Sequence, residues 1–197
     1  MSIATIPEPR VFSQPVVNGR KDFGPVADDS LYEIVHGQRV ELPPMSFFAI
    51  LIASRLNTAL STFVEAHQLG TSVTEALFIL AGQEKIRRRP DVAFVSHHTW
   101  PRTRPFPKEG DLEVVPDLAV EVVSPTDLAE QVFAKIVEYF HYGVKQVWMI
   151  LPTLEMVYVY DSLRTVRVVT EDQELADTII PGFRWHLREL FQPHPKP

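Results

Sequence analysis

The pattern of apolar and polar positions along this chain predicts a sheet of many strands with two main helices. In the first helix, residues 47–67, apolar side chains recur at helical spacing after a capping Ser46, and Gly70 is expected to end it. In the second, residues 128–142, they form one apolar face behind a capping Asp127. Apolar runs predict strands at residues 31–35, 39–42, 71–80, 89–95, 116–125, 144–151, 156–160 and 165–169.

The order of these elements indicates an α/β protein of the α+β type. Strands and a long helix come first, and strand, strand, helix, strand and further strands follow, which is typical of helices packed on a central mixed sheet. At 197 residues the chain suffices for one domain, which we place at residues 29–192. Residues 1–28 are predicted as an extended arm, because they are rich in proline and polar side chains, and residues 193–197 as a tail.

Composition excludes several classes of site. The chain has no cysteine, which removes disulfides, thiolate zinc sites and cysteine nucleophiles, and which fits a reducing cytoplasm. No basic segment followed by an apolar core opens the sequence, and no apolar run approaches the ~20 residues that span a bilayer. We therefore expect a cytoplasmic protein with no membrane partner.

The charge balance bears on nucleic-acid binding. A net charge of −6 argues against a non-specific DNA coat, but not against a nuclease, because enzymes that hold divalent cations gather carboxylates at the site. Phosphate contacts would then come from a local basic segment, Arg87, Arg88 and Arg89, or from the basic loop at residues 97–110. A solvated run of charge is the alternative interpretation of both segments.

Glu121 stands alone in the most apolar strand of the chain, residues 116–125. Burying an ionised carboxylate costs several kcal/mol or more unless a cation or hydrogen-bond donors neutralise it. Alternation along the strand places Asp117, Ala119 and Glu121 on one face, where the small Ala119 leaves space. Glu121 is therefore the first candidate for a functional carboxylate.

Asp91 and Lys135 are the predicted partners of Glu121. Asp91 begins a neighbouring apolar strand, and if the two strands pair, both carboxylates converge at one end of the sheet and repel unless a positive charge lies between them. Such hard oxygen ligands suit Mg²⁺ or Mn²⁺, whereas zinc would favour cysteine or paired histidines. Lys135, on the following helix, can lean toward them. Structural roles remain open as the alternative: strand-end hydrogen bonds for Asp91 and Asp117, and a solvated lysine at position 135.

Four segments follow one another in a specific order: Arg88 to Val95, Pro116 to Asp127, Lys135 to Tyr139, and Gly143 to Trp148. Together they resemble the Uma-two family of proposed endonucleases, which belongs to the restriction-endonuclease-like PD-(D/E)XK superfamily. The resemblance runs over residues 31–191 and leaves out the arm. It implies a restriction-endonuclease-like core and Mg²⁺-dependent hydrolysis of phosphodiester bonds in nucleic acid, with DNA the more expected substrate.

By position, the resemblance makes Asp91 and Glu121 the metal-binding carboxylates. The superfamily's lysine normally follows the second carboxylate by two residues, but Val123 stands there, and Lys135 takes its place on the following helix. Lys135 would orient the nucleophile or stabilise charge on the phosphate. Glu75 is a candidate for a further metal ligand, and no organic cofactor is expected.

The alternative is a non-catalytic binding or assembly protein that retains the nuclease fold. It is favoured by the acidic balance, by Val123, and by residues 46–48, which read Ser-Phe-Phe where many family members carry a histidine. In that case Lys135 would form a structural ion pair with Glu121.

A homo-oligomer, most simply a dimer, is also expected. The proline-rich arm and exposed aromatic side chains such as Trp100 and Phe106 are suited to completing a neighbouring subunit.

Overall fold

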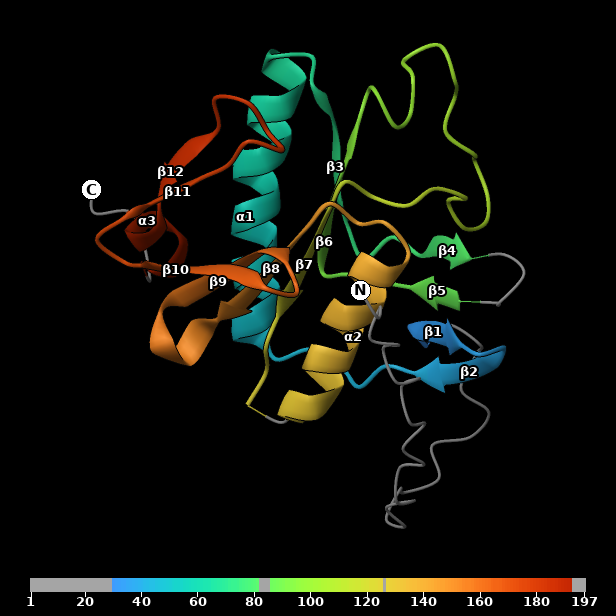
Figure 1. The fold of residues 1–197 in the computed structure, drawn as a ribbon, viewed down its shortest axis with the longest axis horizontal. Coiled ribbons are helices and arrows are strands. Elements are labelled where there is room, and N and C mark those ends of the chain that lie inside the picture. Colours follow the sequence, from blue (N-terminus) through green and yellow to red (C-terminus); the bar gives the residue numbers. More distant parts are fainter. Residues whose placement is uncertain (1–29, 82–85, 126, 193–197) are drawn as a thin grey trace, which may run out of the picture. The chain divides into compact units, whose positions relative to one another are not determined.

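The computed structural model describes residues 30–81, 86–125 and 127–192 (Figure 1). The arm predicted for residues 1–28 and the tail predicted for residues 193–197 lie outside this range. Within it, the chain forms a six-stranded sheet, a four-stranded sheet and a two-stranded sheet.

The four-stranded sheet contains the predicted N-terminal hairpin. β1 (Tyr32–Val35) and β2 (Gln38–Glu41) pair in antiparallel fashion, with Val35 opposite Gln38 across the turn. β5 (Ile86–Arg88) pairs with β1 and with β4 (Phe78–Ala81), so the order is β2-β1-β5-β4. This small sheet carries the basic segment.

The six-stranded sheet is mixed, as predicted, and runs in the order β10-β9-β8-β7-β6-β3. β7 and β8 are parallel and are joined through α2, while the other neighbours are antiparallel. A two-stranded sheet of β11 (Glu174–Ala176) and β12 (Arg184–His186) follows. The strands of the large sheet are β3 (Gly70–Thr74), β6 (Val92–Ser96), β7 (Leu118–Val122), β8 (Gln146–Leu151), β9 (Met156–Ser162) and β10 (Thr165–Thr170).

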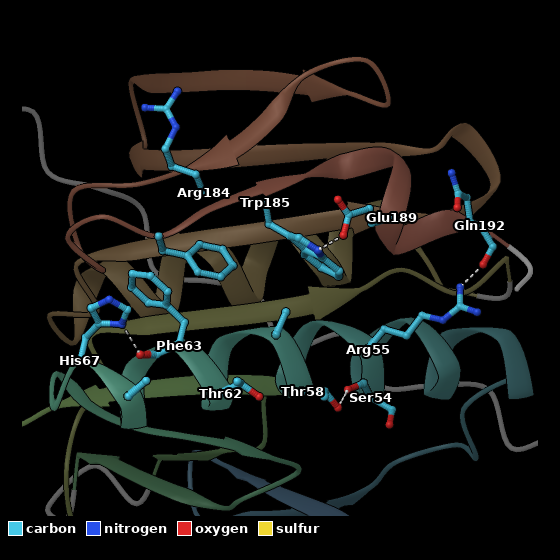
Figure 2. A pocket seen from close by; sticks show the side chains of 13 residues that line it. Ser54, Arg55, Thr58, Thr62, Phe63, His67, Arg184, Trp185, Glu189 and Gln192 are labelled. Carbon is cyan, nitrogen blue, oxygen red and sulfur yellow. Dashed lines mark hydrogen bonds between the residues drawn. The ribbon is translucent and has the colours of Figure 1, made fainter. Parts of the chain in front are cut away.

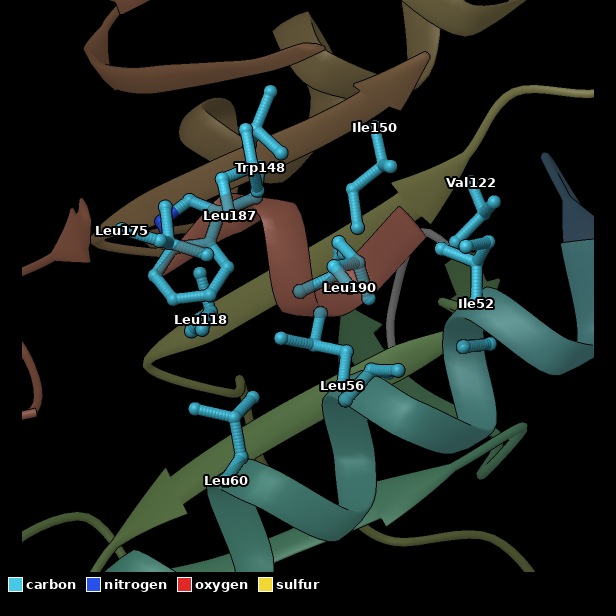
Figure 3. Packing of buried hydrophobic residues seen from close by; sticks show 14 of the residues in the cluster. Ile52, Leu56, Leu60, Leu118, Val122, Trp148, Ile150, Leu175, Leu187 and Leu190 are labelled. Carbon is cyan, nitrogen blue, oxygen red and sulfur yellow. The ribbon is translucent and has the colours of Figure 1, made fainter. Parts of the chain in front are cut away.

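One face of the large sheet is covered by α1 (Phe47–Ala66) and the short α3 (Leu187–Phe191). Ser46 caps α1 as predicted, because its hydroxyl oxygen accepts a hydrogen bond from Ala49 N at 3.2 Å. The buried stripe of α1 packs with strand side chains into one apolar cluster (Figure 3). Figure 3 labels from this cluster Ile52, Leu56, Leu60, Leu118, Val122, Trp148, Ile150, Leu175, Leu187 and Leu190.

α1 is also long and apolar enough to cross a membrane, by length and composition alone. The expectation that no apolar stretch approaches that length was therefore wrong. Ile52, Leu56 and Leu60 of this helix are fully buried against the sheet. A core helix meets the same criterion, and this packing accounts for its apolar composition.

The other face of the sheet is covered by α2 (Ala129–His141), which packs into a second apolar cluster. Leu118 and Val120 of β7 belong to the α1 cluster, whereas Ala119 between them belongs to the α2 cluster. The alternation predicted for this strand is therefore confirmed. It places the Glu121 side chain on the α2 face.

The segment predicted as one strand at residues 71–80 is divided between two sheets. β3 ends at Thr74, Glu75 adopts a left-handed conformation with φ of 50°, and β4 begins at Phe78 in the smaller sheet. Gly70 does not end α1, which stops at Ala66. Gly70 instead opens β3, where a Cβ atom would lie 2.3 Å from the carbonyl oxygen of Val95.

Two other expectations need correction. Asp127 does not cap α2: the capping position is Leu128, and Asp127 Oδ2 accepts a hydrogen bond from Ser124 N at 2.7 Å, closing the preceding turn. Trp100 is not exposed. It is 5% accessible, stacks on Phe106 with ring centroids 5.4 Å apart, and lies under the Arg104 guanidinium.

Candidate active site

The strand register brings Asp91 and Glu121 together. β6 and β7 are antiparallel with Val92 opposite Val120, so Asp91, which directly precedes β6, comes opposite Glu121. Asp91 Oδ2 accepts a hydrogen bond from Val122 N at 2.6 Å, which ties it to the end of β7. The convergence expected from the sequence is therefore present in the fold.

Glu121 is a buried residue, 8% exposed to solvent, and two side chains of α2 bind its carboxylate. The Tyr139 hydroxyl donates to Oε1 at 2.6 Å, and Lys135 Nζ lies 3.1 Å from Oε2. Because α2 leads from β7 back to β8, residues in its middle pass over β7 and can reach its side chains. Lys135 thus reaches Glu121, as the sequence predicts.

Lys135 is held from a second side by the N-terminal hairpin. Its Nζ lies 3.3 Å from Oε1 of Glu33, a buried residue of β1. Arg89 N donates to the same oxygen at 3.1 Å, and Arg88 pairs with the other oxygen at 2.7 Å. Arg88 in turn pairs with Glu138 of α2. The small sheet and α2 are therefore linked through buried ion pairs.

This cluster carries more negative than positive charge. Its four carboxylates and two cations leave an excess of two negative charges when all are ionised. Such an excess in a partly dry site is unfavourable unless a further cation enters or a proton is retained. The members are Asp91, Glu121, Glu33, Glu138, Lys135 and Arg88.

The excess charge is concentrated at Asp91 and Glu121. Burial, with repulsion from Glu121 adding to it, raises the pKa of Asp91 to about 8. Burial also raises the pKa of Glu121 above its ordinary value, although Lys135 opposes this. Burial alone would raise the pKa of Glu33 too, but Lys135 and Arg88 outweigh it and hold that pKa low. The Asp91–Glu121 pair therefore lacks the neutralisation that Glu33 has.

The donors of this pair fit a hard divalent cation. Mg²⁺ typically binds through one or two carboxylates and keeps water in its remaining positions. Among the residues that the structure describes, no three histidine or carboxylate side chains gather closely enough to form a metal cage. Asp91 and Glu121 supply two carboxylates of the kind that Mg²⁺ or Mn²⁺ binds.

The backbone of Glu75, and not its carboxylate, contacts the residues around this pair. Its N–H donates to the Asp91 carbonyl oxygen at 3.3 Å, and its own carbonyl accepts from Arg89. Its carboxylate does not complete a set of three with Asp91 and Glu121 in the described part of the chain. The further metal ligand expected at position 75 is therefore not in place in this structure.

The three arginines of the basic segment have different environments. Arg88 is buried between Glu33 and Glu138, which gives it a structural role and removes it from contact with a phosphate. The Arg87 side chain is 40% exposed and pairs with Asp111. Arg89 is held by backbone groups and lies near the Tyr32 ring. A substrate contact remains a prediction for Arg87 and Arg89.

Asp117 has the structural role that its sequence context left open. Its carboxylate accepts hydrogen bonds from Ser96 N at 2.6 Å and Thr99 Oγ1 at 2.8 Å, and it pairs with Lys145. Burial alone would raise its pKa, but these donors outweigh that and lower it. Asp117 therefore anchors the loop after β6 at the opposite end of β7 from Glu121.

Sequence reasoning missed Glu33, Glu138 and Tyr139 as members of the site. Tyr139 lies one helical turn after Lys135, so helical spacing alone could have placed its hydroxyl beside the lysine. Glu33 lies in an apolar strand, the same signal that identified Glu121. The pairing of Glu138 with Arg88 joins residues 50 positions apart and depends on how the two sheets meet.

A large groove lies elsewhere, between α1 and the β12–α3 segment (Figure 2). It encloses about 740 Å³ and is lined by aromatic side chains, including Phe63, Phe183 and Trp185. It opens on the α1 side of the molecule, whereas Glu121 faces α2. The groove is therefore separate from the carboxylate pair.

Most of the chain is similar to known proteins. The model of a family described as "Uma2: Putative restriction endonuclease" matches residues 22–188. No curated protein matches. A similar solved structure is described as "a putative nuclease belonging to DUF820 from Anabaena variabilis ATCC 29413", with a TM-score of 0.68 and 19% sequence identity. The match covers 81% of this chain and 89% of that one, and at this identity it establishes the fold alone.

Proposed function

The chain belongs to the Uma2 family, described as "Putative restriction endonuclease", and from this membership we propose that it is a Mg²⁺-dependent nuclease that cleaves DNA. Mn²⁺ would serve in place of Mg²⁺. The observation that carries the proposal is the opposed pair of carboxylates, Asp91 and Glu121, in a buried cluster with excess negative charge. A divalent cation at that pair would offset the charge that Lys135 leaves uncompensated.

In the proposed reaction, a water oxygen forms a bond to phosphorus and gives up one proton to solvent. The bond from phosphorus to the leaving oxygen breaks, and the leaving oxygen takes up a proton from solvent. Asp91 and Glu121 would hold the cation, which when bound would acidify water and neutralise charge on the phosphate. Val122 N and the Tyr139 hydroxyl fix the two carboxylates. They therefore need little reorganisation when the cation binds.

Lys135 would act as a fixed positive charge. Burial alone would lower its pKa, but Glu121 and Glu33 outweigh burial and raise the pKa above its ordinary value. The ammonium group therefore keeps its proton at neutral pH and would stabilise charge on the phosphate rather than remove a proton from water. Its side chain is 21% exposed, so a substrate at the surface is within reach.

A cleavage assay tests the proposal. The protein is incubated with supercoiled plasmid and, separately, with single-stranded DNA and RNA, in Mg²⁺, in Mn²⁺ and in EDTA. We expect metal-dependent cleavage of DNA, and a loss of at least about 100-fold for Glu121→Gln. Glu130→Gln, on the exposed side of the same helix, is the matched control and should cleave as wild type does. Absence of cleavage of every nucleic acid in both metals would contradict the proposal.

A non-catalytic protein on the same fold is the second candidate. It is favoured by one observation: Lys135 is shared between Glu121 and Glu33, as a structural ion pair requires. In that case the wild-type protein binds no divalent cation at the Asp91–Glu121 pair and cleaves nothing. Calorimetric titration with Mg²⁺ and Mn²⁺ separates the two candidates.

A further inference from the structure

The ammonium group of Lys135 connects three elements of the fold. Its Nζ atom, on α2, lies 3.1 Å from Oε2 of Glu121 in β7 and 3.3 Å from Oε1 of Glu33 in β1. β7 belongs to the six-stranded sheet and β1 to the four-stranded sheet (Figure 1). The position of Lys135 therefore depends on both sheets, although only Glu121 belongs to the proposed cation site.

The Glu33 carboxylate is itself held in place. Glu33 is 1% exposed, and Arg89 N donates to its Oε1 at 3.1 Å while Arg88 pairs with its Oε2 at 2.7 Å. Lys135 and Arg88 outweigh the effect of burial and keep the pKa of Glu33 below its ordinary value. The carboxylate is therefore ionised at neutral pH, and it presents a fixed negative charge to Lys135.

Opposite charges alternate from the small sheet toward the cation site. The row consists of Arg88, Glu33, Lys135 and Glu121, each in contact with the next. Asp91 lies beyond Glu121, and only there do two negative groups of the row stand side by side.

A divalent cation at the pair must share the Glu121 carboxylate with the Lys135 ammonium group, and the two positive charges repel each other. Glu33 offers the ammonium group a second carboxylate. This carboxylate is not one that the cation needs, because no set of three carboxylates forms around the pair in the described part of the chain.

We propose that Glu33 is the positioning residue of Lys135: it keeps the ammonium group beside the site when a divalent cation takes over the Glu121 carboxylate. This inference rests on the proposed cation site. Without the Glu33 contact, Lys135 and the cation would compete for one buried carboxylate, so the cation would bind more weakly. Glu33 would touch neither the cation nor the phosphate, and would act through Lys135 alone.

This role gives the N-terminal hairpin a part in the site. β1 supplies no member of the Asp91–Glu121 pair, yet its docking against α2 sets where Lys135 lies. Arg88 and the backbone of Arg89, at the end of β5, fix the carboxylate that does so. The small sheet would thus contribute to cation binding from a distance, through one ammonium group.

Calorimetric titration of the full chain with Mn²⁺ tests the inference in a double-mutant cycle. Glu33→Asp keeps the charge but shortens the side chain, so the 3.3 Å contact with Lys135 is expected to open. We expect the Kd for Mn²⁺ to rise about tenfold, the scale on which a hydrogen bond between charged groups contributes. In the background of Lys135→Met, the same Glu33→Asp change should alter the Kd by less than about threefold, because the group through which Glu33 acts is absent.

Glu174→Asp is the matched control. Glu174 also pairs with an arginine, at 2.7 Å, but it lies in β11 and outside the cation site, so this variant should bind Mn²⁺ as wild type does. Circular dichroism establishes that each variant is folded. If Glu33→Asp does not fold, Glu33→Gln, which keeps the length of the side chain, replaces it in the cycle. The effect of a lost charge on the cation appears in both backgrounds and cancels, so the same coupling with Lys135 is expected.

The outcomes separate this inference from the proposed function. An unchanged Kd in Glu33→Asp, or equal effects with and without Lys135, would overturn the inference and leave the cation site standing. A wild-type protein that binds no Mn²⁺ would overturn both. Coupling between Glu33 and Lys135 in a protein that cleaves no nucleic acid would support the inference and contradict only the nuclease.

Discussion

Removal of the Lys135 ammonium group should destabilise the protein through the two carboxylates that it pairs with. In Lys135→Met, the methionine keeps the length of the apolar stem, but Glu121 and Glu33 lose a cation at 3.1 and 3.3 Å. Arg88 still neutralises Glu33, so the larger cost falls on Glu121. The substitution thus isolates the charge of the lysine from its packing.

The magnitude follows from the burial of the pair. Breaking a buried ion pair by removing one partner costs roughly 3–5 kcal/mol, and the 21% exposure of Lys135 puts this case near the lower end, at about 3 kcal/mol. For a domain of this size, 1 kcal/mol lowers Tm by about 2–4 °C. We therefore expect a decrease in Tm of roughly 6–12 °C at pH 8.

The loss should be smaller in acid. The pKa of Glu121 is already raised by burial, so without Lys135 it can take up a proton and escape the cost. The folded variant then binds a proton that the unfolded chain releases, so its stability falls as pH rises. Calorimetry of wild type and variant in EDTA at pH 5.5 and pH 8 measures this difference.

A second substitution separates charge from packing. Adding Glu121→Gln to Lys135→Met removes the unpaired carboxylate and should restore most of the lost stability without restoring cleavage. Lys108→Met, in the exposed loop after β6, is the control and should change Tm by less than about 1 °C. An unchanged Tm in Lys135→Met, or a double variant less stable than the single one, would refute the reasoning.

Three further outcomes are expected. Asp91→Asn should abolish Mg²⁺ binding in calorimetric titration. The pKa of Asp91 is about 8 in the folded protein and near 4 in the unfolded chain. The free energy of unfolding of the metal-free wild type should therefore fall by up to about 1.4 kcal/mol per pH unit as pH rises between these values, and Asp91→Asn should remove this pH dependence. Asp117→Asn should lower the free energy of unfolding by about 1–3 kcal/mol, measured by urea unfolding at pH 7. Because the pKa of Asp117 is lowered in the folded protein, the stability that this carboxylate contributes in the wild type should be present above about pH 4 and be lost as pH falls. Gly70→Ala should cost about 1–3 kcal/mol or more, since its Cβ would lie 2.3 Å from Val95 O, and a wild-type Tm in this variant would contradict the packing of β3.

Much of the fold could be predicted from local pattern. The cap at Ser46 and the alternation around Glu121 depend on neighbouring residues, and both are present in the structure. The prediction failed where the chain leaves one sheet for another. The apolar run at residues 71–80 has no break in composition, and the division at Glu75 depends on β4 finding β5 and β3 finding β6.

The candidate site was predictable only in part for a related reason. Asp91, Glu121 and Lys135 lie in adjacent elements, so the register of two strands and the spacing of one helix bring them together. Glu33 reaches Lys135 from the N-terminal hairpin, across a gap of about a hundred residues. Such a contact depends on the packing of two sheets, which strand periodicity does not determine. The same packing buries Arg88, which the sequence presented as one of three equivalent arginines.

A crystal soaked in Mn²⁺ tests most directly whether Asp91 and Glu121 hold a divalent cation. An anomalous difference map should show a peak about 2.0–2.2 Å from a carboxylate oxygen of each residue, and no such peak in crystals of Asp91→Asn. A map of the wild-type protein with no peak at this pair, while Lys135 keeps its contacts with Glu121 and Glu33, would contradict the claim and leave the ion pair as a structural feature.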